Sequence, residues 1–249
     1  MKERKLEVYL GERFVGTMAQ TADRRVAFAY SEEWLDNGFA ISPFSLPVEQ
    51  RVFVPTSQAF SGLWGVFADS LPDAWGQLLV DRMLKARGIL SADMTQLERL
   101  AIVGDSGMGA LAYRPAWNIQ QDAVIGDLDE LSAQCHAILN HEDAGDLDEL
   151  FQMGGSSGGA RPKIMTTIDD EEWIIKFPAH VDGKNVGKME YDYACCAKAC
   201  GIDMTEVRLF PSKKCKGYFG IKRFDRERIV DGIGTKVKAG NKKKRIHML

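Results

Sequence analysis

The part of the sequence with the clearest potential for chemistry is a glycine-serine loop at residues 154–163, GGSSGGARPK. Four glycines and two serines fill its first six positions, and glycine loses more backbone entropy in a helix than any other residue. Glycine does allow the main chain to approach a ligand closely, with N–H groups free to bind phosphate oxygens. We call this stretch the glycine loop and predict that it binds an anion.

Two strand-like segments follow the glycine loop. Ile164–Ile168 and Trp173–Pro178 are apolar and β-branched, and an acidic turn at residues 169–172 separates them, which predicts a hairpin. Lys176 lies inside the second segment, where a charge is costly unless it is paired. A glycine-rich loop followed by a lysine on a strand is the arrangement that kinase-type folds use to hold nucleotide phosphates.

Other interpretations of the glycine loop are weaker. A Walker A loop needs lysine after its last glycine, but Ala160 follows Gly159. Residues 155–159 spell G-x-S-x-G, which would make Ser157 a hydrolase nucleophile, yet that motif turns from a strand into a helix and Pro162 with a β-branched segment follows here. A flexible glycine-serine linker is the third interpretation, and Lys163, Lys176 and the flanking strands argue against it.

A second glycine cluster, residues 104–109, contains GDSG, the sequence around the nucleophile of trypsin-like proteases, with Ser106 as the serine. The chain lacks the disulfide framework of those enzymes, and all of its histidines lie downstream of Ser106. We therefore predict an ordinary turn at this position.

The composition is that of an ordinary globular protein, with 45% hydrophobic and 27% charged residues in 249. No apolar segment is long enough to span a membrane, and residues 1–5 lead into no signal segment. Five cysteines in spacings unlike a zinc knuckle predict reduced, mostly buried thiols in a cytoplasmic protein.

Charge is unevenly distributed along the chain. The net charge is −3, but residues 211–249 hold 13 Lys and Arg against 3 Asp and Glu. This basic end is consistent either with binding to nucleic acid or nucleotide phosphates or with an ordinary solvated surface.

Hydrophobic periodicity predicts further elements. The first segments indicate a hairpin over 5–16 and a strand over 26–30. Helices are expected from Ala74 to Gly88, from Ser91 to Val103 with a cap at Ser91 or Asp93, and around 128–139. A helix over 188–200 is expected to end at Gly201 and to carry Glu190, Tyr193, Ala194 and Ala197 on one face.

Several ordered motifs resemble those of HipA-like serine/threonine kinase toxins. In the N-terminal part the matching residues are 8–16, 41–47, 67–73 and 103–110, and downstream they are Gly158–Lys163, 174–176, Glu190 and 223–226. The resemblance covers the whole chain except residues 115–152, which are predicted to form a helical connection.

The resemblance implies roles for individual residues. Lys176 corresponds to the lysine that pairs with the α- and β-phosphates of ATP, with Glu190 as its helix partner, and Ser156 to an autophosphorylated serine. The hinge strand that would face adenine contains Arg223 and Asp225 as supporting residues. The remaining residues expected to contact the nucleotide are Ser157, Gly158, Gly159, Ala160, Lys163, Lys222 and Phe224.

The chain departs from this family pattern at its C-terminal end. Family members continue into a helical lobe that carries the catalytic aspartate and the magnesium ligands, and no H-x-D-x-x-x-x-N or D-F-G equivalent occurs here. ATP and Mg are expected only through the resemblance, no metal ligand or catalytic residue is assigned, and the fragment is expected to be inactive.

We therefore predict an α+β protein. Its parts are a mainly antiparallel β N-terminal subdomain (1–116), a helical connection (117–152) and a kinase-like N-lobe, a β-sheet with one helix (153–249), with the catalytic lobe missing. The expected partners are a HipB-like DNA-binding antitoxin, with indirect contact to DNA, the missing lobe, and a protein substrate from the translation machinery. The alternative is a non-catalytic binding module, a split or degenerate toxin half that engages an antitoxin or a separate lobe.

Overall fold

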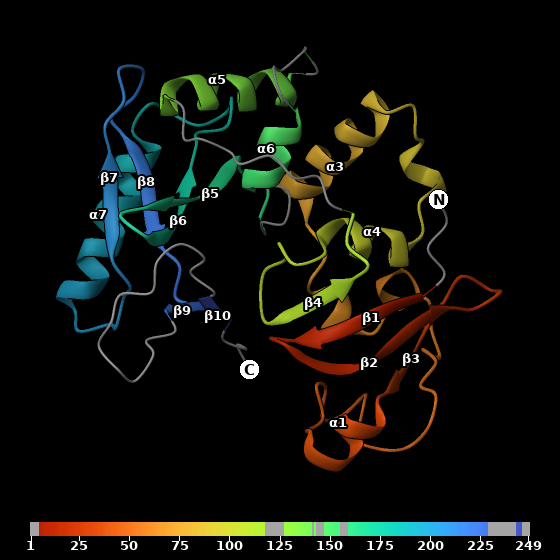
Figure 1. The fold of residues 1–249 in the computed structure, drawn as a ribbon. Coiled ribbons are helices and arrows are strands. Elements are labelled where there is room, and N and C mark those ends of the chain that lie inside the picture. Colours follow the sequence, from red (N-terminus) through yellow and green to blue (C-terminus); the bar gives the residue numbers. More distant parts are fainter. Residues whose placement is uncertain are drawn as a thin grey trace. The chain divides into compact units, whose positions relative to one another are not determined.

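The computed structural model describes residues 5–117, 127–140, 142, 147–154, 159–228 and 243–245. Within these ranges the chain forms two four-stranded antiparallel sheets and a small two-stranded one, with helices packed beside them (Figure 1). The predicted α+β class is confirmed. The chain divides into two compact units, one built from Met1–Pro72 and Leu84–Ile119 and the other from Asp73–Met83 and Gln120–Ile246.

The first unit is organised around the sheet β3-β2-β1-β4. Its strands are β1 (Lys5–Leu10), β2 (Arg13–Gln20), β3 (Val26–Tyr30) and β4 (Leu111–Arg114). Leu6 and Val8 alternate with exposed residues along β1 and are buried, as period-two patterning requires. The hairpin and the strand predicted for residues 5–30 are confirmed.

Short helices cover this first sheet. They are α1 (Glu32–Asn37), α2 (Gly65–Ala68) and α4 (Gln96–Val103), together with 3₁₀ turns at Ala59–Gly62 and Ser91–Asp93. Helix α4 packs against β1, β2 and β4. The buried core between them is rich in aromatic and aliphatic side chains, among them Phe28, Trp34, Phe67, Leu100 and Tyr113.

The predicted cap of the helix over 91–103 was wrong. Ser91 and Asp93 belong to a separate 3₁₀ turn, and α4 begins after Thr95, whose hydroxyl accepts the N–H of Glu98. The Glu98 carboxylate accepts the Thr95 N–H in return at 2.8 Å. This reciprocal pair is a capping box, and its T-x-x-E signature is visible in the sequence.

Thr95→Ala should lower the free energy of unfolding of the first unit by about 0.5–2 kcal/mol, because it leaves an N-terminal N–H of α4 without its acceptor. Glu98→Gln keeps an acceptor at the third helical position and should cost less. Urea unfolding of both variants measures the difference. A neutral Thr95→Ala would contradict the capping role.

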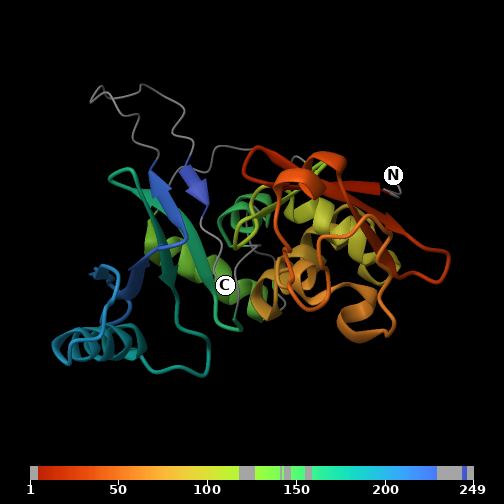
Figure 2. The same cartoon turned by 90° about the horizontal axis from the view of Figure 1, so that it is seen from below.

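The second unit is organised around the sheet β5-β6-β8-β7 (Figure 2). Its strands are β5 (Lys163–Ile168), β6 (Glu171–Lys176), β7 (Val207–Phe210) and β8 (Tyr218–Lys222), followed by the pair β9 (Arg226–Arg228) and β10 (Lys243–Arg245). The helices are α3 (Ala74–Ala86), α5 (Leu128–Leu139), α6 (Leu147–Gly154) and α7 (Val186–Ala199). Of α3, the residues up to Met83 belong to this unit.

The turn between β5 and β6 is tighter than predicted. Only Asp169 and Asp170 form it, both with positive φ (51° and 63°), and Ile168 pairs with Glu171. Two consecutive left-handed residues are the geometry of a two-residue hairpin turn, which short polar side chains such as Asp tolerate. The four-residue turn expected at 169–172 was therefore too long, although the hairpin itself is confirmed.

The two faces of this second sheet differ in chemistry. Register places Lys163, Lys176 and Phe219 in one row, so that these residues share a face, which we call the lysine face. The opposite face, the core face, carries buried apolar residues that include Ile164, Trp173, Ile175 and Tyr218.

Helices cover the two faces of this sheet differently. On the core face, the Tyr218 hydroxyl donates to Asp129 of α5 at 2.8 Å, and α6 packs against β5. Helix α7 packs against β7 and β8 instead. Within residues 153–249 the expected single helix is α7, and α5 and nearly all of α6 come from the segment predicted as a helical connection.

Helix α6 was not predicted, and it changes the role of Gly154. This glycine is the last residue of α6 rather than the start of an irregular loop. A Cβ on Gly154 would lie 2.5 Å from the Lys163 carbonyl oxygen and 3.1 Å from the Trp75 indole nitrogen. Gly154 thus permits close contact between α6, β5 and α3.

Among the described helices, none is both long and apolar enough to cross a bilayer.

Candidate functional site

Two lysines stand side by side on the lysine face, next to the described end of the glycine loop. Lys163 begins β5 and lies directly opposite Lys176, the last residue of β6. Lys163 is only 6% exposed, whereas about a third of the Lys176 side chain is accessible. Like charges directly opposite one another on a sheet are destabilising, so this pair needs anions close by.

Gly159 brings the main chain against the first of these lysines. Its φ is +89°, and a Cβ there would lie 2.9 Å from the Lys163 ammonium nitrogen. The left-handed conformation favours glycine. The backbone of the glycine loop therefore reaches the ammonium end of Lys163.

The first turn of α3 braces Gly159 from the other side. The Gly159 N–H donates to the Asp73 carboxylate, and the Trp75 N–H donates to the Gly159 carbonyl at 3.3 Å. The Trp75 indole N–H also donates to the Lys163 carbonyl at 3.1 Å. The end of the glycine loop is thus fixed by α3 rather than left to its own flexible backbone.

Burial lowers the pKa of Lys163, and the neighbouring Lys176 ammonium lowers it further. Asp73 and Glu190 oppose this shift, because nearby negative charge favours the protonated amine. A ligand that brought further negative charge to this position would act in the same direction as these two carboxylates. The lysine pair is thus suited to an anion.

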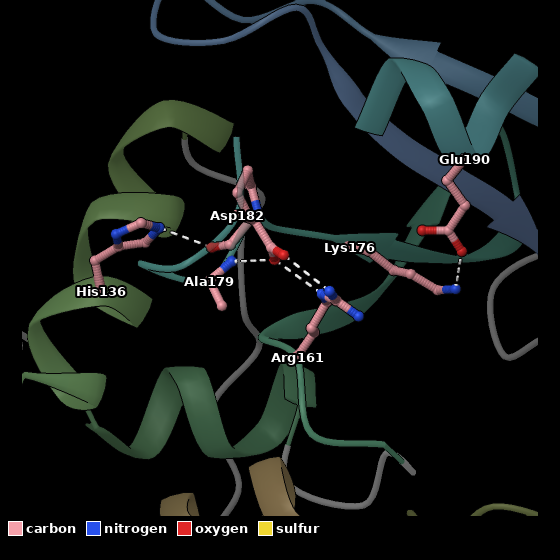
Figure 3. A network of polar contacts seen from close by, with 7 residues as sticks. His136, Arg161, Lys176, Ala179, Asp182 and Glu190 are labelled. Carbon is pink, nitrogen blue, oxygen red and sulfur yellow. Dashed lines mark hydrogen bonds and ion pairs between the residues drawn. The ribbon is translucent and has the colours of Figure 1, made fainter. Parts of the chain in front are cut away.

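Lys176 forms an ion pair with Glu190 of α7 (Figure 3). Its ammonium also lies 5.3 Å from the centroid of the Phe219 ring. Helix α7 can approach the sheet closely because Gly187 has no side chain. A Cβ at this position would lie 2.2 Å from the Gly217 carbonyl oxygen. The structure thus brings together the lysine and the helix glutamate whose pairing the sequence left open.

Helix α7 begins two residues before the predicted start at Lys188. Of the residues predicted to share a face with Glu190, Ala194 is buried and Tyr193 is 76% exposed. Gly201 follows the helix with φ +84°, and the Gly201 N–H donates to the Lys198 carbonyl at 3.0 Å, so the predicted helix end is confirmed.

Arg161 and Asp182 connect the end of the glycine loop to the segment between β6 and α7. The guanidinium donates twice to the carboxylate, at 2.8 Å each, and Asp182 also accepts the Ala179 N–H at 2.8 Å (Figure 3). Nε2 of His136, on α5, lies 2.8 Å from the Pro178 carbonyl oxygen. We call Arg161 with Asp182 the loop clamp, because it joins the loop to the segment that links Lys176 with Glu190.

The other end of the lysine face is held by a buried ion pair. Arg223 donates to both carboxylate oxygens of Asp225, at 2.9 and 2.7 Å, and lies 3.4 Å from the Glu172 carboxylate. Its guanidinium also lies 3.0 Å from the Met165 sulfur. Such a buried, bidentate pair fixes the backbone after β8.

Between its charged ends the lysine face is apolar and half-buried. The register places Met165, Ile174 and Ile221 there. Lys222, predicted to contact the nucleotide, pairs with Trp173 in the register and therefore lies on the core face, where it forms an ion pair with Glu171 at 3.2 Å. Phe224 is 63% exposed. The lysine face therefore offers the two lysine cations at one end and an apolar surface beside them.

Three predicted site residues, Ser156, Ser157 and Gly158, lie outside the described residues. Ala160 is exposed beside Gly159. Sequence reasoning missed Asp73, Asp182 and the role of Arg161. Arg161 was visible inside the motif, but nothing in the sequence marks Asp182 as its partner or Asp73 as the partner of Gly159.

Ser106 lies in a turn, as predicted. Its hydroxyl donates to the Val103 carbonyl at 2.8 Å, and its N–H donates to the same oxygen at 2.9 Å. These are the bonds of a turn at the end of α4.

Two family models match the sequence. One, described as the HipA N-terminal domain, matches residues 6–114, and the other, described as the HipA-like C-terminal domain, matches residues 155–249. Together they cover most of the chain, and they confirm the family that its motifs resemble. This chain is a HipA-like protein. No curated protein sequence matches it.

The two matches divide the HipA-like chain at the segment that carries α5 and α6. The first match contains the sheet β3-β2-β1-β4 except Lys5, the first residue of β1. The second contains the glycine loop from residue 155, both lysines, Glu190 and the Arg223–Asp225 pair. All four strands of the lysine face thus belong to the HipA-like C-terminal domain.

The thiols of this HipA-like protein are less buried than predicted. Only Cys135 among the five is buried, whereas Cys195, Cys196 and Cys200 are exposed on or beside α7. Burial was predicted because a free cysteine packs like a small apolar side chain. Helix α7, however, buries only Gly187 and Ala194. None of the five forms a disulfide.

Thiol labelling should separate these cysteines. At pH 8 iodoacetamide should modify Cys195, Cys196 and Cys200, while burial raises the pKa of Cys135 to about 12 and protects it. Peptide mass spectrometry before and after unfolding in urea measures the difference. Labelling of Cys135 in the native protein as fast as in urea would contradict the packing of α5.

The loop clamp should make stability depend on pH. The Arg161 guanidinium and the Ala179 N–H lower the pKa of Asp182 to about 2. The carboxylate is more acidic in the folded state, so its contribution is complete above the unfolded value of about 3.9 and is lost as pH falls towards 2. Asp182→Asn should lower the unfolding midpoint at pH 7.

The difference between wild type and Asp182→Asn should shrink steadily below about pH 4. Thermal unfolding from pH 7 to pH 2.5, with exposed Asp203→Asn as control, measures it. A difference that stays constant over this range would mean that the charge of Asp182 does not stabilise the fold.

Proposed function

We propose that this HipA-like protein is the toxin component of a toxin–antitoxin pair and that its lysine face binds ATP as the nucleotide-binding half of a serine/threonine kinase. The observation that supports this most directly is the pairing of Lys176 with Glu190 beside Lys163 and Gly159. A strand lysine held by a helix glutamate is the arrangement that positions nucleotide phosphates in kinases.

The residues present fit a nucleotide. Lys163 and Lys176 supply two cations in one row, and the backbone of Gly159 reaches the ammonium end of Lys163. The half-buried apolar row of Met165, Ile174 and Ile221 would receive the base. ATP, when bound, would supply the phosphoryl group.

Each residue has a separate task in this proposal. Lys176 would bind the α- and β-phosphates, and Glu190 orients its ammonium. Lys163 would bind phosphate at the mouth of the glycine loop, where a second negative group would offset the cost of burying its charge. Arg161 and Asp182 position the loop without touching the nucleotide.

Magnesium enters the proposal through the family alone. Across the described ranges no group of three His, Cys, Asp or Glu side chains is arranged to hold a metal ion. We therefore assign no residue to magnesium. The proposed partners are a HipB-like DNA-binding antitoxin and a protein substrate from the translation machinery, and Ser156 is the proposed site of autophosphorylation.

Removal of the Lys176 cation tests the proposal. Lys176→Met should reduce the affinity for Mg-ATP by at least about tenfold, because it removes a charge-assisted contact to phosphate. Exposed Lys198→Met on α7 is the matched control and should bind as wild type. Isothermal titration calorimetry with each variant, and circular dichroism to establish folding, give the comparison.

Equal ATP affinity in wild type and Lys176→Met would overturn the nucleotide proposal. A folded chain that binds no ATP but forms a complex with a HipB-like antitoxin would instead favour the alternative, a non-catalytic binding module. That outcome leaves the family assignment in place and removes only the nucleotide.

A further inference from the structure

A groove of about 500 Å³ lies beside α5, away from the lysine pair. This size falls within the range of small-molecule sites. Its walls come from α5, from the segment between β6 and α7, and from the loop between β7 and β8. The lining residues that matter here are Ala133, His136, Ala179, Lys184, Lys214 and Tyr218. We call it the α5 groove.

The α5 groove and the lysine face are on opposite sides of the sheet. Tyr218 lines the groove and bonds to Asp129 of α5, whereas its neighbour Phe219 lies under the Lys176 ammonium. Successive residues of a strand point to opposite faces. A ligand in the groove therefore cannot be the nucleotide of the proposed function.

The segments that carry the groove lysines are fixed to each other and to α5. The Lys216 N–H donates to the Lys184 carbonyl at 2.8 Å. Asp129 accepts the Ser212 hydroxyl at 2.5 Å and the Lys213 N–H at 2.9 Å, and the Lys214 ammonium lies 3.3 Å from the Asp129 carbonyl. Lys214 is thus placed at the start of α5 by a loop that is itself anchored.

The groove lining carries two cationic and two acidic side chains, and the Asp129 carboxylate of α5 lies near Lys214. Its cationic side chains are Lys184 and Lys214, and its carboxylates are Asp182 and Glu142. Asp182 is already neutralised by the bidentate Arg161. Lys213 and Lys216, on the same loop but outside the groove lining, add further positive potential. Lys213, Lys214 and Lys216 belong to the basic C-terminal region, residues 211–249, whose partner the sequence left open.

The floor of the groove is made of small, largely apolar residues. Ala133 and Ala137 of α5 face Pro178 and Ala179 across it. Figure 3 shows His136 and Ala179 near one another beside this floor, where the His136 ring bonds to the Pro178 carbonyl. Since that carbonyl can only accept, Nε2 carries the hydrogen. These short, apolar side chains give a flat ring a surface to lie on.

We propose that the α5 groove is a second ligand site, which binds a phosphorylated small molecule that carries a flat ring. Lys184 and Lys214 bind the phosphate, and the ring lies on the alanine and proline floor. The phosphate accepts charge-assisted hydrogen bonds from the two ammonium groups, and the ring buries apolar surface that is otherwise exposed to water. This site does not depend on ATP binding at the lysine face.

The test uses adenosine monophosphate and ribose 5-phosphate as probes, with binding measured by calorimetry and by amide chemical shifts. Adenosine monophosphate should shift amides of α5 and of residues 178–184 and 212–218, and it should bind more tightly than ribose 5-phosphate. The double variant Lys184→Gln/Lys214→Gln should lose about tenfold or more in affinity.

The matched control is Lys213→Gln/Lys216→Gln, which removes the same amount of charge, from the loop that carries Lys214, but spares the groove lining. It should bind nearly as wild type. Ala133→Leu, a substitution at an exposed position of α5, should block the ring. It should therefore lower the affinity for adenosine monophosphate more than the affinity for ribose 5-phosphate.

Lys176→Met should leave binding at the groove unchanged, which separates this site from the proposed nucleotide site. The proposal is overturned if neither probe binds or if both double variants weaken binding equally. It is also overturned if Lys176→Met abolishes the binding, or if the two probes bind equally well.

Discussion

The register of β5 against β6 is the constraint on which the candidate site depends. It sets Lys163 directly opposite Lys176, so that two ammonium groups share one face of the sheet with one of them almost buried. Such a pair is unfavourable alone. Glu190, the Asp73 carboxylate and the close backbone of Gly159 surround it, and these features together form a site suited to a polyanion.

The surrounding structure keeps this pair in place. The first turn of α3 fixes Gly159, the loop clamp joins Arg161 to the segment before α7, and Gly187 lets α7 approach the sheet. A glycine loop would otherwise be poorly ordered, since glycine has the largest backbone freedom to lose. The packing of α3 and α7 therefore fixes the geometry of the candidate site.

The sequence predicted the hairpin, the helix that carries Glu190 and the family, because these follow from local periodicity and ordered motifs. It did not predict which residue faces Lys176. With a four-residue turn at 169–172, Ile168 would have paired with Trp173, and Met165 would have stood opposite Lys176. The two-residue turn at Asp169 and Asp170 shifts the register by two and brings Lys163 there instead. Asp73 and Asp182 could not be found because their contacts are set by tertiary packing.

An amide chemical-shift titration of the whole chain with Mg-ATP tests the central claim most directly, because it locates the nucleotide residue by residue. We expect saturable shifts, with one common affinity, at Gly159, at Lys163 and Lys176, and at Glu190. The same titration on Lys176→Met should lose them. Shifts confined to other parts of the sheet, or none at millimolar ATP, would contradict the account.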